Sequence, residues 1–184
     1  VNRRVIRFIP ASGMATRMFD FLFPLVVEDK QDFKTALDAH QDNPKVKRFI
    51  GGVQHFPFYE IAKEHIENEH SHPIDETDFL KAFVAYVVKH YANKPKAFVP
   101  FHKYNKTLKT AIEEQLNYAI QFSLANDHLA HHFTVTPGYE NDFDQHIQDA
   151  RLMLENSHSC SVDVYYSVQE ASTDSLVMDS EGQL

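Results

Sequence analysis

The chain has 184 residues, 43% of them hydrophobic, which is enough for one α/β domain with its own core. Its formal net charge of -8 argues against a surface for nucleic acid or anionic membranes, because both partners require a basic face. Cys160 is the single cysteine, so no internal disulfide is expected, and no apolar run reaches the roughly 18 residues that would span a bilayer. These features predict a cytoplasmic protein that binds neither nucleic acid nor membrane.

The first predicted unit is a strand, a loop of small residues and a helix. Residues 5–9 are mostly β-branched or aromatic and end at Pro10, which is typical of a buried strand. From Thr16 onward, apolar residues recur at helical spacing. The loop between strand and helix is therefore expected to open directly into a helix N-terminus.

Residues 31–93 carry a helical pattern and are predicted to form a helical insertion. Its clearest helix follows Asp75, a typical N-cap residue, with Asp78 at the third helical position and an apolar stripe that extends to Tyr91. The breaker-rich residues 93–95, Asn-Lys-Pro, separate the insertion from the carboxyl-terminal half of the chain.

Strands and helices alternate after the insertion. The pattern predicts an extended segment at 97–101, a helix at 110–124, a strand at 132–136, a helix at 141–155 and a strand at 162–168. Such alternation is typical of a parallel sheet with helices on both faces, whose ligands bind at the carboxyl ends of the strands. The final residues, 176–184, resemble the first arm of a hairpin, so the chain is expected to be a fragment.

The loop at residues 10–18 is the strongest candidate for a phosphate site. It places small residues and a hydroxyl between a strand end and a helix start, where unpaired amide groups bind anions. Arg17 would add a permanently charged, bidentate partner. The loop residues assigned to nucleotide binding are Ala11, Ser12, Gly13, Met14, Ala15 and Thr16. Taken alone, the loop is equally consistent with an ordinary turn that carries a surface arginine.

This loop is similar to the Leu-Ala-Gly-Gly-x-Gly-Thr-Arg signature of sugar-nucleotide pyrophosphorylases. The residues in register with that signature are Ala11, Gly13, Thr16 and Arg17. Ser12 and Ala15 stand where two glycines are usual. The resemblance implies that the loop wraps the nucleotide phosphates and that Arg17, as a catalytic residue, contacts the pyrophosphate.

Two further segments resemble the same family. Residues 95–101 are similar to its Pro-Lys dipeptide and apolar run, which implies that Lys96 is a second catalytic cation at the phosphates. Residues 168–174 are similar to its loop after a glutamine, which implies that Gln169 reads the nucleobase beside Ser172 and Thr173. Taken alone, Lys96 is also consistent with a solvated linker, and Gln169 with a polar strand end.

The whole chain also resembles an uncharacterised bacterial family of pyrophosphorylase-like proteins. The likeness lies in the Pro-Ala-Ser-Gly-x-Ala-Thr-Arg-Met loop, the Pro-Lys…Pro-Phe-His segment and the Gln…Ser-Thr-Asp loop. It implies an α/β, three-layer, Rossmann-like nucleotidyltransferase sheet of the GT-A-like class. Residues 1–184 would be its amino-terminal part, with the helical insertion at about 31–93.

A full-length protein of this kind would join a nucleoside triphosphate and a sugar phosphate into a nucleotide sugar and release pyrophosphate, with Mg²⁺ bridging the phosphates. The resemblance places the metal-binding aspartate beyond Leu184. Asp174 and Asp179 are therefore not assigned as ligands, and the fragment by itself is expected to be inactive. Two alternatives stay open: a non-catalytic regulatory module that binds a nucleotide or sugar phosphate, and an α/β domain that binds no nucleotide.

Overall fold

The computed structural model describes residues 5–26, 32–105, 107–123 and 128–170. The chain forms two compact units. We call Val1–Ser12 with Leu116–Leu184 the sheet unit, and Gly13–Gln115 the helical unit. Within the described ranges, no helix is long and apolar enough to cross a membrane.

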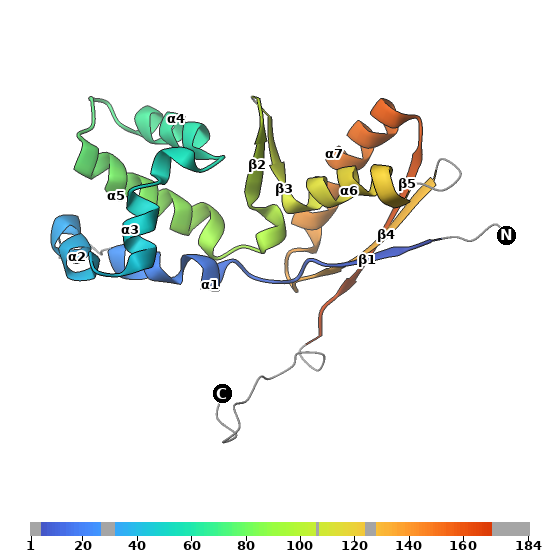
Figure 1. Ribbon diagram of the computed structural model, residues 1–184, viewed down its shortest axis with the longest axis horizontal. Helices are drawn as coiled ribbons and strands as arrows, with labels where there is room; N and C mark the ends of the chain where they lie inside the picture. The colour runs from blue at the N-terminus through green and yellow to red at the C-terminus, as the bar shows by residue number, and fades with distance from the viewer. Residues whose placement is uncertain (1–4, 27–31, 106, 124–127, 171–184) are drawn as a thin grey trace, which may run out of the picture. The chain divides into compact units, whose positions relative to one another are not determined.

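The sheet unit is built on parallel strands. Its strands are β1 (Arg7–Pro10), β4 (His128–Val135) and β5 (Ser161–Val168), in the order β1-β4-β5 (Figure 1). Odd-numbered residues of β4 are buried, whereas the even-numbered ones, apart from Ala130, are half-buried, so the strand has two different faces. The prediction of a mixed α/β chain with a parallel sheet is confirmed.

Two helices, α6 (Ala111–Ser123) and α7 (Glu140–His158), pack on the same face of this sheet. The guanidinium of Arg7 in β1 lies 5.1 Å from the ring centroid of Tyr118 in α6. The Phe133 ring of β4 lies 5.3 Å from the Phe143 ring of α7. Arg7 pairs with His131 on the neighbouring strand, so both side chains point to the same face of the sheet. Phe133 lies two residues after His131 and points to that face as well, because alternate residues of a strand share a face.

The opposite face, which we call the open face, has no helix on it among the described residues of the sheet unit. Phe8 on this face is 62% exposed and Tyr165 is 43% exposed. The sequence pattern predicts helices on both faces, and the described residues do not show them. The strand order supplies the reason, since right-handed connections that add strands in one direction place their helices on one face.

The helical unit begins with short helices. After the single turn α1 (Thr16–Phe19) come η1 (Asp20–Leu25), α2 (Phe33–His40), α3 (Pro44–Ile50), η2 (Val53–His55), α4 (Tyr59–Glu69), α5 (Glu76–Val87), η3 (Val88–Ala92) and η4 (Lys96–Phe98). The side chain of Asp75 accepts a hydrogen bond from the Asp78 amide at 2.8 Å, so the predicted N-cap of α5 is confirmed.

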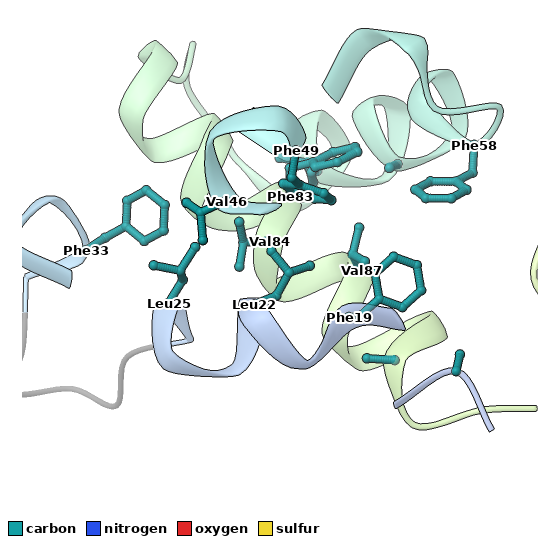
Figure 2. Close-up of a cluster of buried hydrophobic side chains, with 14 of the residues drawn as sticks. Phe19, Leu22, Leu25, Phe33, Val46, Phe49, Phe58, Phe83, Val84 and Val87 are labelled. Carbon is teal, nitrogen blue, oxygen red and sulfur yellow. The ribbon is translucent and has the colours of Figure 1, made fainter. Parts of the chain in front are cut away.

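A cluster of buried aromatic and aliphatic side chains holds these helices together. Figure 2 shows its members from η1, α2, α3 and α5 converging on one another, among them Leu22, Phe33, Phe49 and Phe83. The Phe49 and Phe83 rings lie 6.0 Å apart, and both residues are at most 4% exposed. The unit thus has a core of its own.

Two local predictions differ from the structure. The helix expected from Thr16 is a single α-turn that continues as the 3₁₀ helix η1, which contains Pro24, a residue without the amide that an α-helix needs. The extended segment expected at 97–101 begins as η4 and then enters β2 (Pro100–Tyr104), which pairs in antiparallel fashion with β3 (Thr107–Thr110).

Candidate functional site

The first part of the loop at residues 10–18 lies at the carboxyl ends of β1 and β4. The Ala11 amide donates to the Thr134 carbonyl at 3.0 Å, and the Thr136 hydroxyl donates to the Ser12 carbonyl at 2.7 Å. These two bonds fix Ala11 and Ser12 at the edge of a parallel sheet where ligands of α/β proteins bind.

The second part of the loop pairs with the Pro-Lys segment inside the helical unit. The Lys96 amide donates to the Gly13 carbonyl at 2.8 Å, and the Ala15 amide donates to the Lys94 carbonyl at 2.9 Å. Met14 lies opposite Pro95 in this short antiparallel bridge. Two segments that flank the helical region in sequence are therefore adjacent in space.

Only part of the loop backbone is available to an anion. The amides of Gly13 and Met14 have no hydrogen-bond partner among the residues that the structure describes, whereas that of Ala15 is engaged by Lys94. Ala15 is also fully buried, so its small side chain serves packing. A Cβ atom at Gly13 would meet nothing within 4 Å, so the space beside this residue is open.

The predicted cations lie on the two paired segments. Arg17 and Lys96 are both exposed, and neither forms an ion pair within the described ranges. Thr16 is exposed as well, at the start of α1. Because α1 is a single turn, its dipole adds little, and the positive charge of this region comes from side chains such as Arg17 and Lys96.

A hollow of about 490 Å³ lies at the carboxyl edge of the sheet, within the sheet unit. The residues that line it are Phe8, Pro10, Ser12, Thr134, Ser167, Val168, Gln169 and Glu170. The backbone amide of Gln169 donates to the Val135 carbonyl at 2.9 Å, which holds Gln169 beside the end of β4. The hollow brings Ser12 and Gln169 to one place, although they are far apart in sequence.

The open face lies next to this hollow and carries residues that the sequence analysis did not predict as site residues. His132 lies in β4, and its Nε2 is 3.1 Å from the Ser167 hydroxyl. The Phe8 ring stacks on His132, with 5.7 Å between ring centroids. The alternation of His128, His132 and Thr134 along one strand is the signal that could have revealed this face.

Some predicted features lie beyond the reach of the structure. Ser172 and Thr173, and the hairpin arm predicted at 176–184, lie outside the described residues. Among the residues that are described, no group of three or more His, Cys, Asp or Glu side chains could hold a metal ion.

Comparisons with known proteins identify a family. A family model described as "Domain of unknown function (DUF4301)" matches residues 1–184. No curated protein and no solved structure matches the chain.

Proposed function

Since the chain belongs to the family of domain of unknown function DUF4301, whose description assigns no activity, we propose a function from its site. We propose that the chain is the nucleotide-binding part of a nucleotidyltransferase, resembling sugar-nucleotide pyrophosphorylases. The full-length enzyme would form a nucleotide sugar and pyrophosphate from a nucleoside triphosphate and a sugar phosphate.

One observation carries the proposal: the hydrogen-bonded pairing of residues 13–15 with residues 94–96. The pairing joins the segments that carry Arg17 and Lys96, next to the Gly13 and Met14 amides, which have no partner among the described residues. Permanent cations together with unpaired amides are what a phosphate chain requires. The segments are also the two that resemble the phosphate-binding elements of pyrophosphorylases.

In the proposed reaction, an oxygen of the sugar phosphate attacks the α-phosphorus of the triphosphate. A new phosphorus–oxygen bond forms as the bond between the α-phosphorus and the bridging oxygen breaks, and pyrophosphate leaves. Arg17 would bind two phosphate oxygens at once, Lys96 would act as a point charge, and the loop amides would orient the chain. Mg²⁺ is expected to accompany the triphosphate, and the described residues offer no ligand set for it.

The hollow of the sheet unit is the proposed place for the nucleobase. The side-chain amide of Gln169 offers both a donor and an acceptor, which a base edge can match. Ser12 lines the same hollow.

Titration calorimetry with each nucleoside triphosphate and Mg²⁺ tests the binding step. We expect the wild type to bind at least one triphosphate, and Arg17→Ala and Lys96→Ala each to weaken that binding by about tenfold or more, because each removes a charge-assisted contact. Lys81→Ala, which removes an exposed lysine of α5, is the matched control and should bind like the wild type. If no triphosphate gives heat, nucleotide binding is wrong.

A pyrophosphate-release assay on the full-length protein, with sugar phosphates added, separates catalysis from a non-catalytic module. One observation favours the module: Ala15, where the pyrophosphorylase signature has a glycine, is buried and its amide is already bound by Lys94. Binding with pyrophosphate release supports the enzyme. Binding without release for any sugar phosphate supports a regulatory module for nucleotides or sugar phosphates.

A further inference from the structure

A second hollow, of about 440 Å³, lies inside the helical unit. It is bordered by α1, η1, α3, η2 and the start of β2. None of the residues assigned to phosphate or base binding lines it. The proposed function does not use it.

The walls of this hollow are aromatic. The rings that line it are those of Phe19, Phe21, Phe49, Phe56 and Phe101. The Phe21 and Phe49 rings meet edge to face at 5.8 Å, and the Phe49 and Phe56 rings lie 5.1 Å apart. Figure 2 shows Phe19 and Phe49 as part of the buried cluster, so the wall is anchored in the core. Fixed aromatic rings suit a planar apolar group.

The rest of the lining includes two cations, Lys45 and Arg48. Lys45, Arg48 and His55 border the hollow, and none of its described lining residues is acidic, in a chain with a net charge of -8. The Lys45 ammonium is 3.1 Å from the Asp20 carboxylate, so part of its charge is already compensated. Arg48 is exposed and forms no ion pair within the described ranges. Arg48 is thus the cation that a ligand anion would meet.

The backbone at the base of the hollow is closely packed. A Cβ atom at Gly52 would lie 3.0 Å from the Arg48 carbonyl oxygen, which is a tight contact. Glycine therefore lets the chain entering η2 pack directly on the last turn of α3. Gly52 also lines the hollow and adds no side chain to it.

We propose that this hollow binds a small organic anion with an aromatic or similarly planar apolar group. The planar group lies against the phenylalanine rings, and the anionic group pairs with the guanidinium of Arg48. Charge complementarity selects this occupant over a neutral apolar molecule, because an uncompensated arginine at the rim favours an anion. The site is independent of the proposed nucleotide-binding function.

The test uses two fluorescent probes of similar shape on the whole chain: 8-anilinonaphthalene-1-sulfonate, which is anionic, and N-phenyl-1-naphthylamine, which is neutral. We expect the anionic probe to saturate one site and Arg48→Gln to weaken it about tenfold, while the affinity of the neutral probe changes less than twofold. Phe101→Ser should weaken both probes, because it removes part of the wall, and Phe101 is 37% exposed, so the fold should persist.

Lys81→Gln is the matched control, since it removes a positive charge from α5 outside the hollow. We expect it to leave both affinities within twofold of the wild type. The proposal is overturned if the wild type shows no saturable binding of the anionic probe. It is equally overturned if Arg48→Gln and Lys81→Gln have the same effect, or if Arg48→Gln weakens both probes alike.

Discussion

His131, at the centre of β4, is a buried histidine without a hydrogen-bond partner for either ring nitrogen among the described residues. Burial, together with the nearby positive charge of Arg7, lowers the pKa of His131 to about 4. The ring is therefore neutral in the folded protein at pH 7. His131 can stay buried between the sheet and its helices because its ring is uncharged.

This residue predicts how stability depends on pH. The ordinary pKa of histidine is about 6.5, so between pH 6.5 and about 4 the unfolded chain binds a proton that the folded chain refuses. The free energy of unfolding should therefore fall as the pH falls through this range. His131 alone contributes a loss of about 2 kcal/mol between pH 7 and pH 5.

Urea unfolding of the wild type and of His131→Leu at pH 7 and pH 5 measures this contribution. We expect the variant to lose about 2 kcal/mol less than the wild type between the two values, because leucine cannot titrate. His158→Gln, which changes an exposed histidine at the end of α7, is the control and should lose as much as the wild type. Equal losses in the wild type and His131→Leu would contradict the assignment.

At the scale of the elements, the two faces of the sheet differ in cover. Phe133 is fully buried against Phe143 of α7, whereas Phe8, on the open face, is 62% exposed. We predict that Phe133→Ala lowers the free energy of unfolding by about 3–5 kcal/mol, since it opens a cavity in the core. Phe8→Ala should change it by less than about 0.5 kcal/mol, as is usual for exposed positions.

Chemical denaturation measures the free energy of unfolding of both variants, and each variant serves as the control for the other. The two residues lie on neighbouring strands and differ mainly in the face to which they point. A loss of several kcal/mol for Phe8→Ala would mean that the open face is covered in the folded protein.

The elements also show how much of the fold could be predicted. The alternating region after the insertion was predictable because each strand and helix there has a clear hydrophobic period, and β5 and α7 lie within a few residues of the predicted ranges. The β2–β3 hairpin was not, because its strands are only five and four residues long and β2 is mostly exposed, so neither strand has a clear hydrophobic period. Its one local sign is Asn105, which adopts a positive φ of 54° between the two strands.

At the scale of the whole molecule, the candidate site depends on long-range pairing. A local pattern could indicate that residues 10–18 form a loop between a strand and a helix, but not that Gly13 and Ala15 pair with Lys94 and Lys96 across the helical region. The same holds for Ser12 and Gln169, which meet only because β5 lies beside β4 and β4 lies beside β1. The resemblance to a known family suggested these partners, and periodicity alone did not.

The net charge of -8 should weaken the binding of a nucleic acid much more than the binding of a single nucleotide. At physiological salt the Debye length is about 8 Å, so a triphosphate in the proposed site would respond mainly to the charges beside it, such as Arg17 and Lys96. A duplex is much longer and meets the acidic surface as a whole, which repels its phosphates.

We therefore predict that a 20-base-pair duplex gives no retarded complex in a gel-shift assay at physiological salt with micromolar protein. An excess of the same duplex should leave triphosphate binding unchanged within about twofold, because the two ligands do not compete. Adding lysines to the acidic surface, away from Arg17 and Lys96, should introduce duplex binding before it changes triphosphate affinity. A salt-sensitive complex of the wild type with the duplex would show that a local basic surface outweighs the net charge, and the expectation that the chain binds no nucleic acid would then be wrong.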